Sequence, residues 1–297
     1  MTWKRSGHPQ AIAESEAYGA TAALYGEIRS LLGVAQVPLL FRIYAAHGEF
    51  LSQFWEAVRP VVASSAFRDA ARRLSADAYT RMHNYFEIGD ARHTATASLP
   101  ELTRVVELLQ QQDGALLLLL SFAAEAFDNP VGRPAAAQES AGPLPVLLPT
   151  LPPAAGGPLT EKILEEARRQ FGTGTVPGEF SVLAHWPGFL QKIWEGWKQI
   201  AASPLLAACQ HGLLLHSIEL AHALPGPVEL SYISLSENGM GEEEFSELAR
   251  LTRNWNQALT TLLPCISAAK IALEGGSGKV HPRPESEEQQ ATPTRAA

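Results

Sequence analysis

One segment of this chain occurs twice, and that repeat constrains the fold more than any other feature of the sequence. Residues 37–64 recur at 176–203 without a gap, an offset of 139 because 176 − 37 = 139. The identical pairs are Val37/Val176, Pro38/Pro177, Phe41/Phe180, Ala45/Ala184, Phe50/Phe189, Leu51/Leu190, Trp55/Trp194, Glu56/Glu195, Ala63/Ala202 and Ser64/Ser203. Matches at one register that include a tryptophan and a proline are not expected from composition, so we predict two related units in tandem.

Both units have the apolar spacing of helices. Apolar residues recur every three or four positions in 22–32 and in 163–171, which is typical of an amphipathic helix. A Val-Pro pair opens the next helix in each unit, since a proline at the first helical position loses no needed N–H. His47 with Gly48, and Pro187 with Gly188, are expected to interrupt that helix. Further helices are expected at 67–87, 100–111 and 115–127, and at 204–224, 242–263 and 267–274.

The predicted fold is therefore all-α: two tandem pseudo-symmetric helical repeats packed as an intramolecular pseudo-dimer. The predicted limits are 14–128 for the first repeat and 159–275 for the second. Between them, 129–158 is dense in proline, glycine and alanine, which suits a linker. The tail 276–297 is poor in apolar residues and is expected to be disordered. A brief alternation after Val228 is too short to indicate a sheet.

Composition and apolar patterning exclude several classes of protein. The 297 residues carry a formal net charge of -8 and no cluster of Lys and Arg with interleaved aromatic residues, so nucleic acid is not an expected partner. The most apolar stretch, 115–124, is about half of the ~20 residues that span a bilayer, so no membrane association is expected. Residues 11–20 contain two glutamates where a signal peptide needs an apolar run, and export is therefore not predicted.

The residue types that bind metals or carry out redox chemistry do not form a recognisable motif. Cys209 and Cys265 are the two cysteines and show no CxxC spacing, which fits a reducing cytoplasm. Glu219 and His222 have the i, i+3 spacing found in carboxylate metal sites, but a single pair without a partner motif favours an ordinary polar pair. No metal site is predicted.

The most informative position is one at which the two repeats differ. Leu40 in the first repeat corresponds to Glu179 in the second, so a carboxylate is present on one side of a nearly symmetric frame. A cleft is expected where the two units meet, and there Glu179 would be a lone base on an apolar wall. The alternative is structural: at the third position of a helix opened by Pro177, a glutamate often caps the helix start.

The segment around this glutamate resembles a motif of a known enzyme family. Residues 179–187 read Glu-Phe-Ser-Val-Leu-Ala-His-Trp-Pro, which is similar to the Asp-Phe-x-x-Leu-Ala-Asn-Trp-Pro segment of the group I 2-haloacid dehalogenases. The Val-Pro pair at 37–38 and the Asn-Pro-Val-Gly run at 129–132 also resemble that family. The resemblance extends over both repeats, from about Leu24 to Leu273, with low identity outside these motifs.

The resemblance implies an all-helical hydrolase that needs no cofactor and acts on a small carboxylic acid. In that family a carboxylate activates a water that displaces halide directly from C2 of a 2-haloalkanoic acid, with no covalent ester. Carried over, Glu179 is the general base, and backbone N–H groups at the helix start receive the substrate carboxylate. The substrate-binding residues implied are Leu39, Phe41, Asp113, Leu116, Gly178, His185 and Trp186. A homodimer is an assembly that the sequence leaves open.

Several positions depart from the family pattern. Glu179 is one methylene longer than the family's aspartate, a shift of roughly 1 Å that costs on the order of 100-fold in rate if nothing compensates. His185 replaces an asparagine, and Asp113 and Leu116 stand where the family tends to carry an asparagine and a tyrosine. Two alternatives follow: a pocket retuned for another substrate, and a non-catalytic or re-purposed small-ligand or interaction protein on the same scaffold.

Overall fold

The computed structural model describes residues 10–134, 156–172, 174–237 and 239–276, and this part of the chain is built from helices. The α-helices are α1 (Gly19–Leu32), α2 (Leu39–Tyr44), α3 (Phe50–Val62), α4 (Ser65–Tyr85), α5 (Leu99–Ala126), α6 (Pro158–Phe171), α7 (Gly178–Leu183), α8 (Pro187–Ala201), α9 (Pro204–Ala223), α10 (Tyr232–Ser236) and α11 (Glu242–Leu273). A 3₁₀ helix, η1 (Arg92–Ser98), precedes α5. The predicted all-α class is confirmed.

The bounds of the helices recur along the chain. α1 and α6 begin and end 139 residues apart, as do α2 and α7, and α4 and α9 begin at the same offset. The recurrence supports the interpretation of two copies of one unit, which stays a prediction together with the limits 14–128 and 159–275. Most of the predicted linker and tail, at 135–155 and 277–297, lies outside the described residues.

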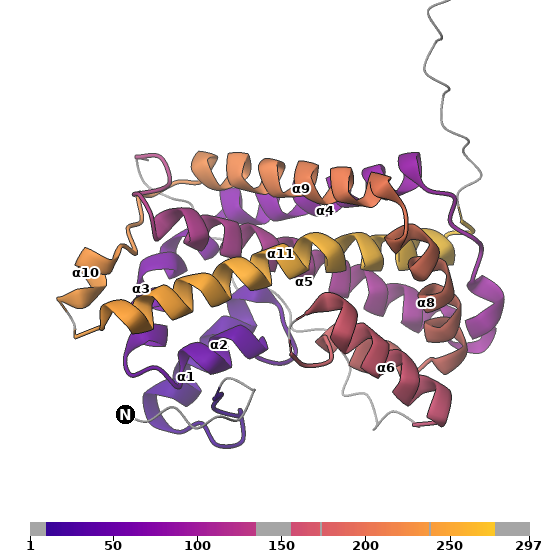
Figure 1. Cartoon of the computed structure of the whole chain (residues 1–297), viewed down its shortest axis with the longest axis horizontal. Helices are drawn as coiled ribbons and strands as arrows, with labels where there is room; N and C mark the ends of the chain where they lie inside the picture. Colours follow the sequence, from indigo (N-terminus) through magenta and orange to yellow (C-terminus); the bar gives the residue numbers. More distant parts are fainter. Residues whose placement is uncertain (1–9, 135–155, 173, 238, 277–297) are drawn as a thin grey trace, which may run out of the picture.

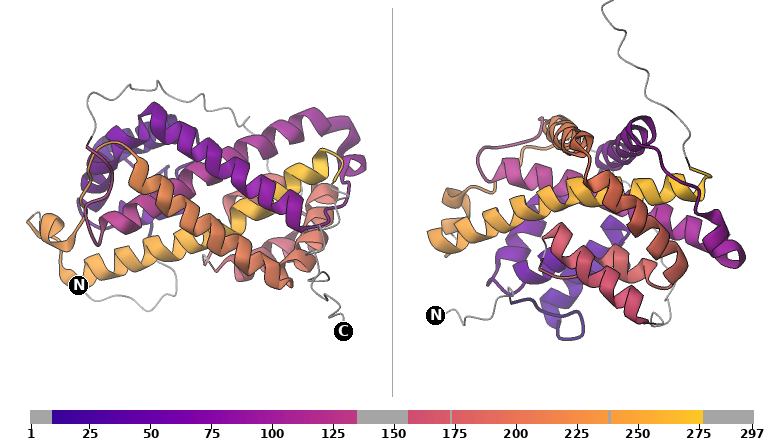
Figure 2. Two further views of the ribbon diagram at one scale, coloured as in Figure 1. Left: turned by 90° about the horizontal axis from the view of Figure 1, so that it is seen from above. Right: turned by 45° about the vertical axis from the view of Figure 1, so that its right-hand side comes forward.

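Four long helices, two from each half of the chain, form the centre of the molecule. α5 and α11 pack against each other, and both pack against α4 and α9. Figure 1 shows α4 and α9 above α5 and α11, with α1 to α3 at the lower left and α6 and α8 at the right. The right-hand view of Figure 2 shows these two outer groups side by side beneath the central helices. Each central helix therefore packs against central helices of the other half, and the two halves share one core.

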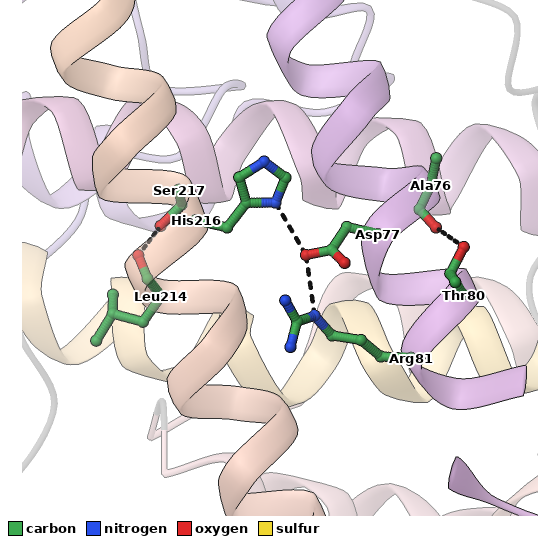
Figure 3. A network of polar contacts seen from close by, with 7 residues as sticks. All are labelled: Ala76, Asp77, Thr80, Arg81, Leu214, His216 and Ser217. Atoms are coloured by element: carbon green, nitrogen blue, oxygen red, sulfur yellow. Dashed lines mark hydrogen bonds and ion pairs between the residues drawn. The ribbon is translucent and has the colours of Figure 1, made fainter. Parts of the chain in front are cut away.

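A polar contact joins α4 to α9 at positions that correspond in the two halves. Asp77 Oδ2 accepts hydrogen bonds from Arg81 Nε and from His216 Nδ1, each 2.9 Å long (Figure 3). Since 216 − 77 = 139, the two halves meet here through the same position of the repeat. Gly212 leaves room for the Arg81 guanidinium, because a Cβ at that glycine would lie 2.3 Å from Nη1.

The same hydrogen bond occurs once inside each half. The Trp55 indole donates to Glu27 over 3.0 Å, which ties α3 to α1, and the Trp194 indole donates to Glu166 over 2.7 Å, which ties α8 to α6. A buried indole N–H needs an acceptor, and a glutamate at the edge of the core supplies it. Both pairs keep the 139-residue offset, so equivalent residues make equivalent contacts.

The helix α5 is a single helix where the sequence predicts two, at 100–111 and 115–127. Gly114 falls between the predicted helices, and its role is packing rather than termination. A Cβ at Gly114 would lie 2.0 Å from Ser75 Oγ and 3.0 Å from the Ala71 carbonyl oxygen. Glycine therefore permits the close approach of α4 to α5.

The helix α11 is likewise continuous, where the sequence predicts breaks between 242–263 and 267–274. Pro264 lies inside it and removes one backbone hydrogen bond. Nearly every residue around Pro264 is buried against the other central helices. Apolar packing on all sides offsets the lost hydrogen bond, and the helix continues.

Gly114→Ala is expected to lower the free energy of unfolding by about 1–3 kcal/mol. The added methyl must displace Ser75 Oγ, whose hydrogen bonds to the carbonyl oxygens of Ala71 and Gln110 are both 3.1 Å. Urea unfolding followed by circular dichroism measures the change. The control is Gly196→Ala on α8, where a Cβ meets nothing within 4 Å and no loss of stability is expected. Equal stability of Gly114→Ala and the parent would contradict the packing role.

Candidate active site

A cavity of about 890 Å³ lies where the two outer groups of helices meet the central helices α5 and α11. Its wall is formed by the segment leading into α2, by the corresponding segment leading into α7, and by facing residues of α5 and α11. Most of the side chains in this wall are apolar. Both halves of the chain therefore contribute to one cavity, which has the size and character of a ligand site.

Two corresponding turns contribute to this wall. Pro38 precedes α2 with φ of -53°, and Pro177 precedes α7 with φ of -57°. The expected place of the prolines needs a correction: each is the cap residue, so Glu179 is the second residue of its helix rather than the third. α7 has six residues, and a helix this short has a weak dipole, which gives little support to the expected carboxylate site at its start.

Two carboxyl groups meet at the cavity wall. Glu179 lines the cavity and stays partly exposed, whereas Asp113 on α5 is 0% exposed and lies outside the lining. Both Asp113 oxygens are buried without a hydrogen-bond donor from any described residue, and the group beside them is the Glu179 carboxyl. A hydrogen bond between these two groups requires a proton on one of them.

The surroundings favour a proton on Asp113. Burial, followed by the charge of Glu179, raises the pKa of Asp113 well above its usual range. Burial also raises the pKa of Glu179, but hydrogen bonds from its own backbone N–H and from Asp113 oppose that rise. Two carboxylates in contact in an apolar site do not both ionise near neutral pH. Such a pair shares one proton, and the larger rise in pKa, at the fully buried Asp113, favours Asp113 as its holder while Glu179 faces the cavity.

Such a carboxylate can act as a general base. Burial makes Glu179 more basic than an exposed glutamate, and its ionised form is the one that accepts a proton. A proton on Asp113 allows Asp113 to donate a hydrogen bond to this carboxylate, which would hold its orientation. The capping alternative is not supported, because no side-chain hydrogen bond caps the start of α7 and its cap residue, Pro177, has no N–H to donate.

A thiol also lies near this pair but is not placed to act as a nucleophile. Cys265 on α11 is 1% exposed. Burial, followed by the neighbouring Asp113 and Glu179 carboxyl groups, raises the pKa of the Cys265 thiol well above its usual value. A neutral thiol is a poor nucleophile, so Cys265 fills space behind the carboxyl pair.

Arg42 is the arginine in the cavity wall, and the lining that the structure describes contains no lysine. Its Nε is buried without a hydrogen-bond partner, and Arg42 makes no ion pair with a described carboxylate. A buried N–H without a partner is unfavourable, and an anion in the cavity would supply an acceptor for it. Sequence reasoning missed Arg42, although its counterpart at the 139-residue offset is the neutral Ser181, which also lines the cavity.

Most of the residues predicted for the site line this one cavity. Those that do are Leu39, Phe41, Leu116, Gly178, Glu179 and His185. Asp113 contacts Glu179 from behind. Trp186 lies outside the lining, where its indole N–H donates to Ser98 Oγ over 2.9 Å and ties the start of α8 to the end of η1.

The wall contributed by α11 was also missed. The residues of α11 that line the cavity are Trp255, Ala258, Leu259 and Leu262. Two of them have counterparts in the wall of α5, because Trp255 corresponds to Leu116 and Leu259 to Leu120 at the offset of 139. Adding 139 to the positions of Leu116 and Leu120 would have identified these two residues from the sequence.

Among the described residues, no group of three or more His, Cys, Asp or Glu side chains is arranged to hold a metal ion. His222, from the weak pattern with Glu219, instead contacts Glu125 of α5, with 2.9 Å between Nε2 and Oε2. None of the helices in the described part of the chain has the length and apolar character needed to cross a membrane.

Comparison with known proteins points to one family. The family model described as Halocarboxylic acid dehydrogenase DehI matches residues 35–168. Three solved structures share the fold: a D-2-haloacid dehalogenase mutant (14% identity, TM-score 0.79), such a mutant in complex with D-2-CPA (15%, 0.80), and D-2-haloacid dehalogenase with L-LA (16%, 0.79). Each match covers 90% of this chain and 96% of the other. No curated protein matches the sequence significantly.

These matches confirm the resemblance to the haloacid dehalogenases, although the motif at 179–187 lies outside the residues that the family model matches. The family match covers most of the first half and reaches into α6, and the likeness of fold extends over both halves. At 14–16% identity the solved structures establish a common fold. The roles of individual residues in this chain are therefore argued from its own geometry.

Proposed function

We propose that this chain, which has the fold of the D-2-haloacid dehalogenases and matches the DehI family over residues 35–168, hydrolyses 2-haloalkanoic acids without a cofactor. One observation carries the proposal: the Glu179 carboxyl lines an apolar cavity, with the fully buried Asp113 carboxyl directly beside it. The products are a 2-hydroxyalkanoic acid, a halide ion and a proton.

In the proposed step, Glu179 acts on water rather than on the substrate. The carboxylate accepts a proton from a water molecule as the water oxygen bonds to C2. The carbon–halogen bond breaks at the same time, and its electron pair leaves on the halide, so the configuration at C2 inverts. A positioned general base contributes on the order of 10²–10⁴ in rate. The apolar wall limits competing hydration of the base.

The two carboxyl residues that depart from the family pattern are in contact with each other. Glu179 stands at the place of the family's aspartate, and Asp113 at the place where an asparagine is common. Because the two side chains touch, changing the length or charge of one of them changes the contact that the other can make. Contact between them supports one coupled change that keeps a base in the cavity, rather than separate losses of function.

Arg42 is proposed to bind the substrate carboxylate, so Arg42→Met is expected to raise KM about 10–100-fold, with a smaller effect on kcat. The loss corresponds to the charge-assisted hydrogen bonds that the guanidinium would make. Steady-state kinetics of halide release measure it. Arg104→Met is the matched control, because Arg104 is exposed on α5 outside the lining and its loss should leave KM unchanged. An unaltered KM in Arg42→Met would assign carboxylate binding to other groups.

Halide release from the D and L forms of 2-chloropropionate and 2-bromopropionate tests the proposed function. Halide and 2-hydroxypropionate are expected in equal amounts. In a single turnover with enzyme in excess in H₂¹⁸O, the product should carry ¹⁸O, because water attacks C2 directly and no ester forms. Absence of halide across the panel, with ligand binding retained, would overturn the proposal in favour of a small-ligand or interaction protein on this scaffold.

We also propose the cytoplasm as the site of action. Cys209 and Cys265 are both free and buried. Unpaired thiols are typical of proteins in a reducing compartment, which supports this location.

A further inference from the structure

The cavity is far larger than a three-carbon haloacid requires. Its volume of about 890 Å³ falls near the top of the range of roughly 300–1,000 Å³ for pockets that enclose drug-sized ligands. A 2-halopropionate has only a handful of non-hydrogen atoms and would leave most of this space to water. Water against an apolar wall is unfavourable, so the volume favours a ligand with more apolar surface.

Away from its charged residues, the wall is suited to such surface. Five of its apolar side chains stay partly exposed because they face the cavity: Leu39, Leu116, Val176, Val182 and Trp255. They come from α2, α5, α7, the segment before α7, and α11, so apolar surface surrounds the space. A hydrocarbon chain placed among these side chains would be buried on several sides.

The charges in the wall match a ligand with a single anionic end. Arg42 lines the cavity with its Nε unpartnered and makes no ion pair with a described carboxylate, while the Glu179 carboxyl lies against that of Asp113 rather than against a cation. The described lining holds no lysine and no second arginine, so a second carboxylate on the ligand would have only His185 or neutral side chains beside it, which is less favourable than a partner such as Arg42. The ligand chemistry is therefore that of a monocarboxylate with an apolar chain.

At one pair of corresponding positions in the wall, the second repeat has a glycine where the first repeat has a leucine. Gly178 corresponds to Leu39 at the 139-residue offset, and both line the cavity. A Cβ placed at Gly178 meets nothing within 4 Å. The cavity is therefore open beside Glu179, where the chain that extends from C2 of a substrate would begin.

We infer that the preferred substrates of this protein are 2-halo monocarboxylic acids with an extended apolar chain, roughly six to twelve carbons long, rather than three-carbon acids. This inference rests on the proposed function. It assigns the carboxylate to Arg42, C2 to the water activated by Glu179, and the chain to the apolar wall that includes Leu116 and Trp255.

The test is a series of 2-bromo acids of increasing length: propionate, hexanoate and decanoate. Burial of each methylene corresponds to about a threefold to fourfold gain in kcat/KM, so hexanoate should exceed propionate by at least tenfold. Binding is measured separately by calorimetry with unreactive butyrate and decanoate. Decanoate is expected to bind at least tenfold more tightly than butyrate.

A pair of glycine variants locates the chain in the cavity. Gly178→Leu fills the open space, so the ratio of kcat/KM for bromodecanoate to that for bromopropionate should fall by at least tenfold. Gly196→Leu makes the same change on the exposed face of α8, outside the lining, and should leave that ratio unchanged. Circular dichroism checks that both variants are folded.

The outcomes separate the inference from the function on which it rests. Halide release from bromopropionate, with no gain for longer acids and no tighter binding of decanoate, overturns the inference and leaves the proposed function intact. Absence of halide from every acid overturns both. A gain with chain length that Gly178→Leu removes and Gly196→Leu retains supports the inference.

Discussion

Glu179→Gln is expected to lower kcat for halide release by on the order of 10³-fold. Glutamine has nearly the same shape as glutamate, so the cavity keeps its form, but the amide does not accept a proton from water. The loss should appear in kcat, because the carboxylate acts in the step that forms the bond to C2. Rapid-mixing measurements with enzyme in excess isolate that step from product release.

Two further variants make this result specific. Glu195→Gln is the matched control, because Glu195 is exposed on α8 and accepts a hydrogen bond from Gln191 over 2.9 Å, away from the cavity. Its rate should equal that of the parent. Glu179→Asp keeps a carboxylate but withdraws it by roughly 1 Å, and its rate should fall by on the order of 100-fold or less. A Glu179→Gln enzyme within threefold of the parent would place the base elsewhere.

The second large effect is expected at Asp113, where Asp113→Leu should lower kcat at neutral pH by on the order of 10²-fold. Leucine removes the hydrogen bond that opposes the rise in the pKa of Glu179, so a larger fraction of Glu179 becomes protonated. Asp113→Asn keeps an N–H donor at the same place and should stay within about tenfold of the parent. Equal rates in the two variants would show that Asp113 only fills space.

The pH profiles of these variants distinguish a proton-holding residue from a structural one. In the parent, burial raises the pKa of Glu179, so kcat/KM should fall with decreasing pH at values above the usual range of a glutamate. Its alkaline limb marks the loss of the second proton of the pair, after which two adjacent carboxylates repel the anionic substrate. Asp113→Asn has no such proton to lose, so the alkaline limb should disappear while the acid limb remains.

The pH dependence of the stability of Asp113→Asn tests independently whether Asp113 is protonated in the folded protein. Burial raises the pKa of Asp113 in the folded protein, so above about pH 4 the folded state binds more protons than the unfolded state. The free energy of unfolding of the parent therefore falls as pH rises towards the folded pKa. Asparagine removes this dependence, and the variant should be more stable than the parent at pH 8, with a smaller difference at pH 4. Urea unfolding at both values measures it.

The fold was predictable to the extent that its signals are local. The apolar spacing in 22–32 and 163–171 identifies helices because one face of each must be buried, whatever it packs against. The breaks predicted at 112–114 and 264–266, where Gly114 and Pro264 lie, were wrong because the effect of these residues depends on distant partners. Gly114 is explained by Ser75 on another helix, and no pattern within α5 contains that information.

The candidate site was predictable where a difference between the repeats is visible in the sequence. The comparison of Leu40 with Glu179 identified a residue that lines the cavity, whereas the same comparison was not extended to Arg42 and Ser181. The contact between Asp113 and Glu179 was not predictable, because it joins two helices from different halves. The burial of Asp113, which raises its pKa, is likewise a property of the packed molecule.

Because the two copies of the repeat lie in one chain, the two ends of the cavity can differ in their chemistry. In an assembly of two identical chains, a glutamate at the Glu179 position and an arginine at the Arg42 position would each appear twice, and the cavity would have no distinct ends. Within a single chain, each of these positions carries a charge in one copy and the neutral Leu40 or Ser181 in the other. Joining the copies in one polypeptide allows them to diverge, so a molecule bound between them meets different chemistry at each end and can be held in a single orientation.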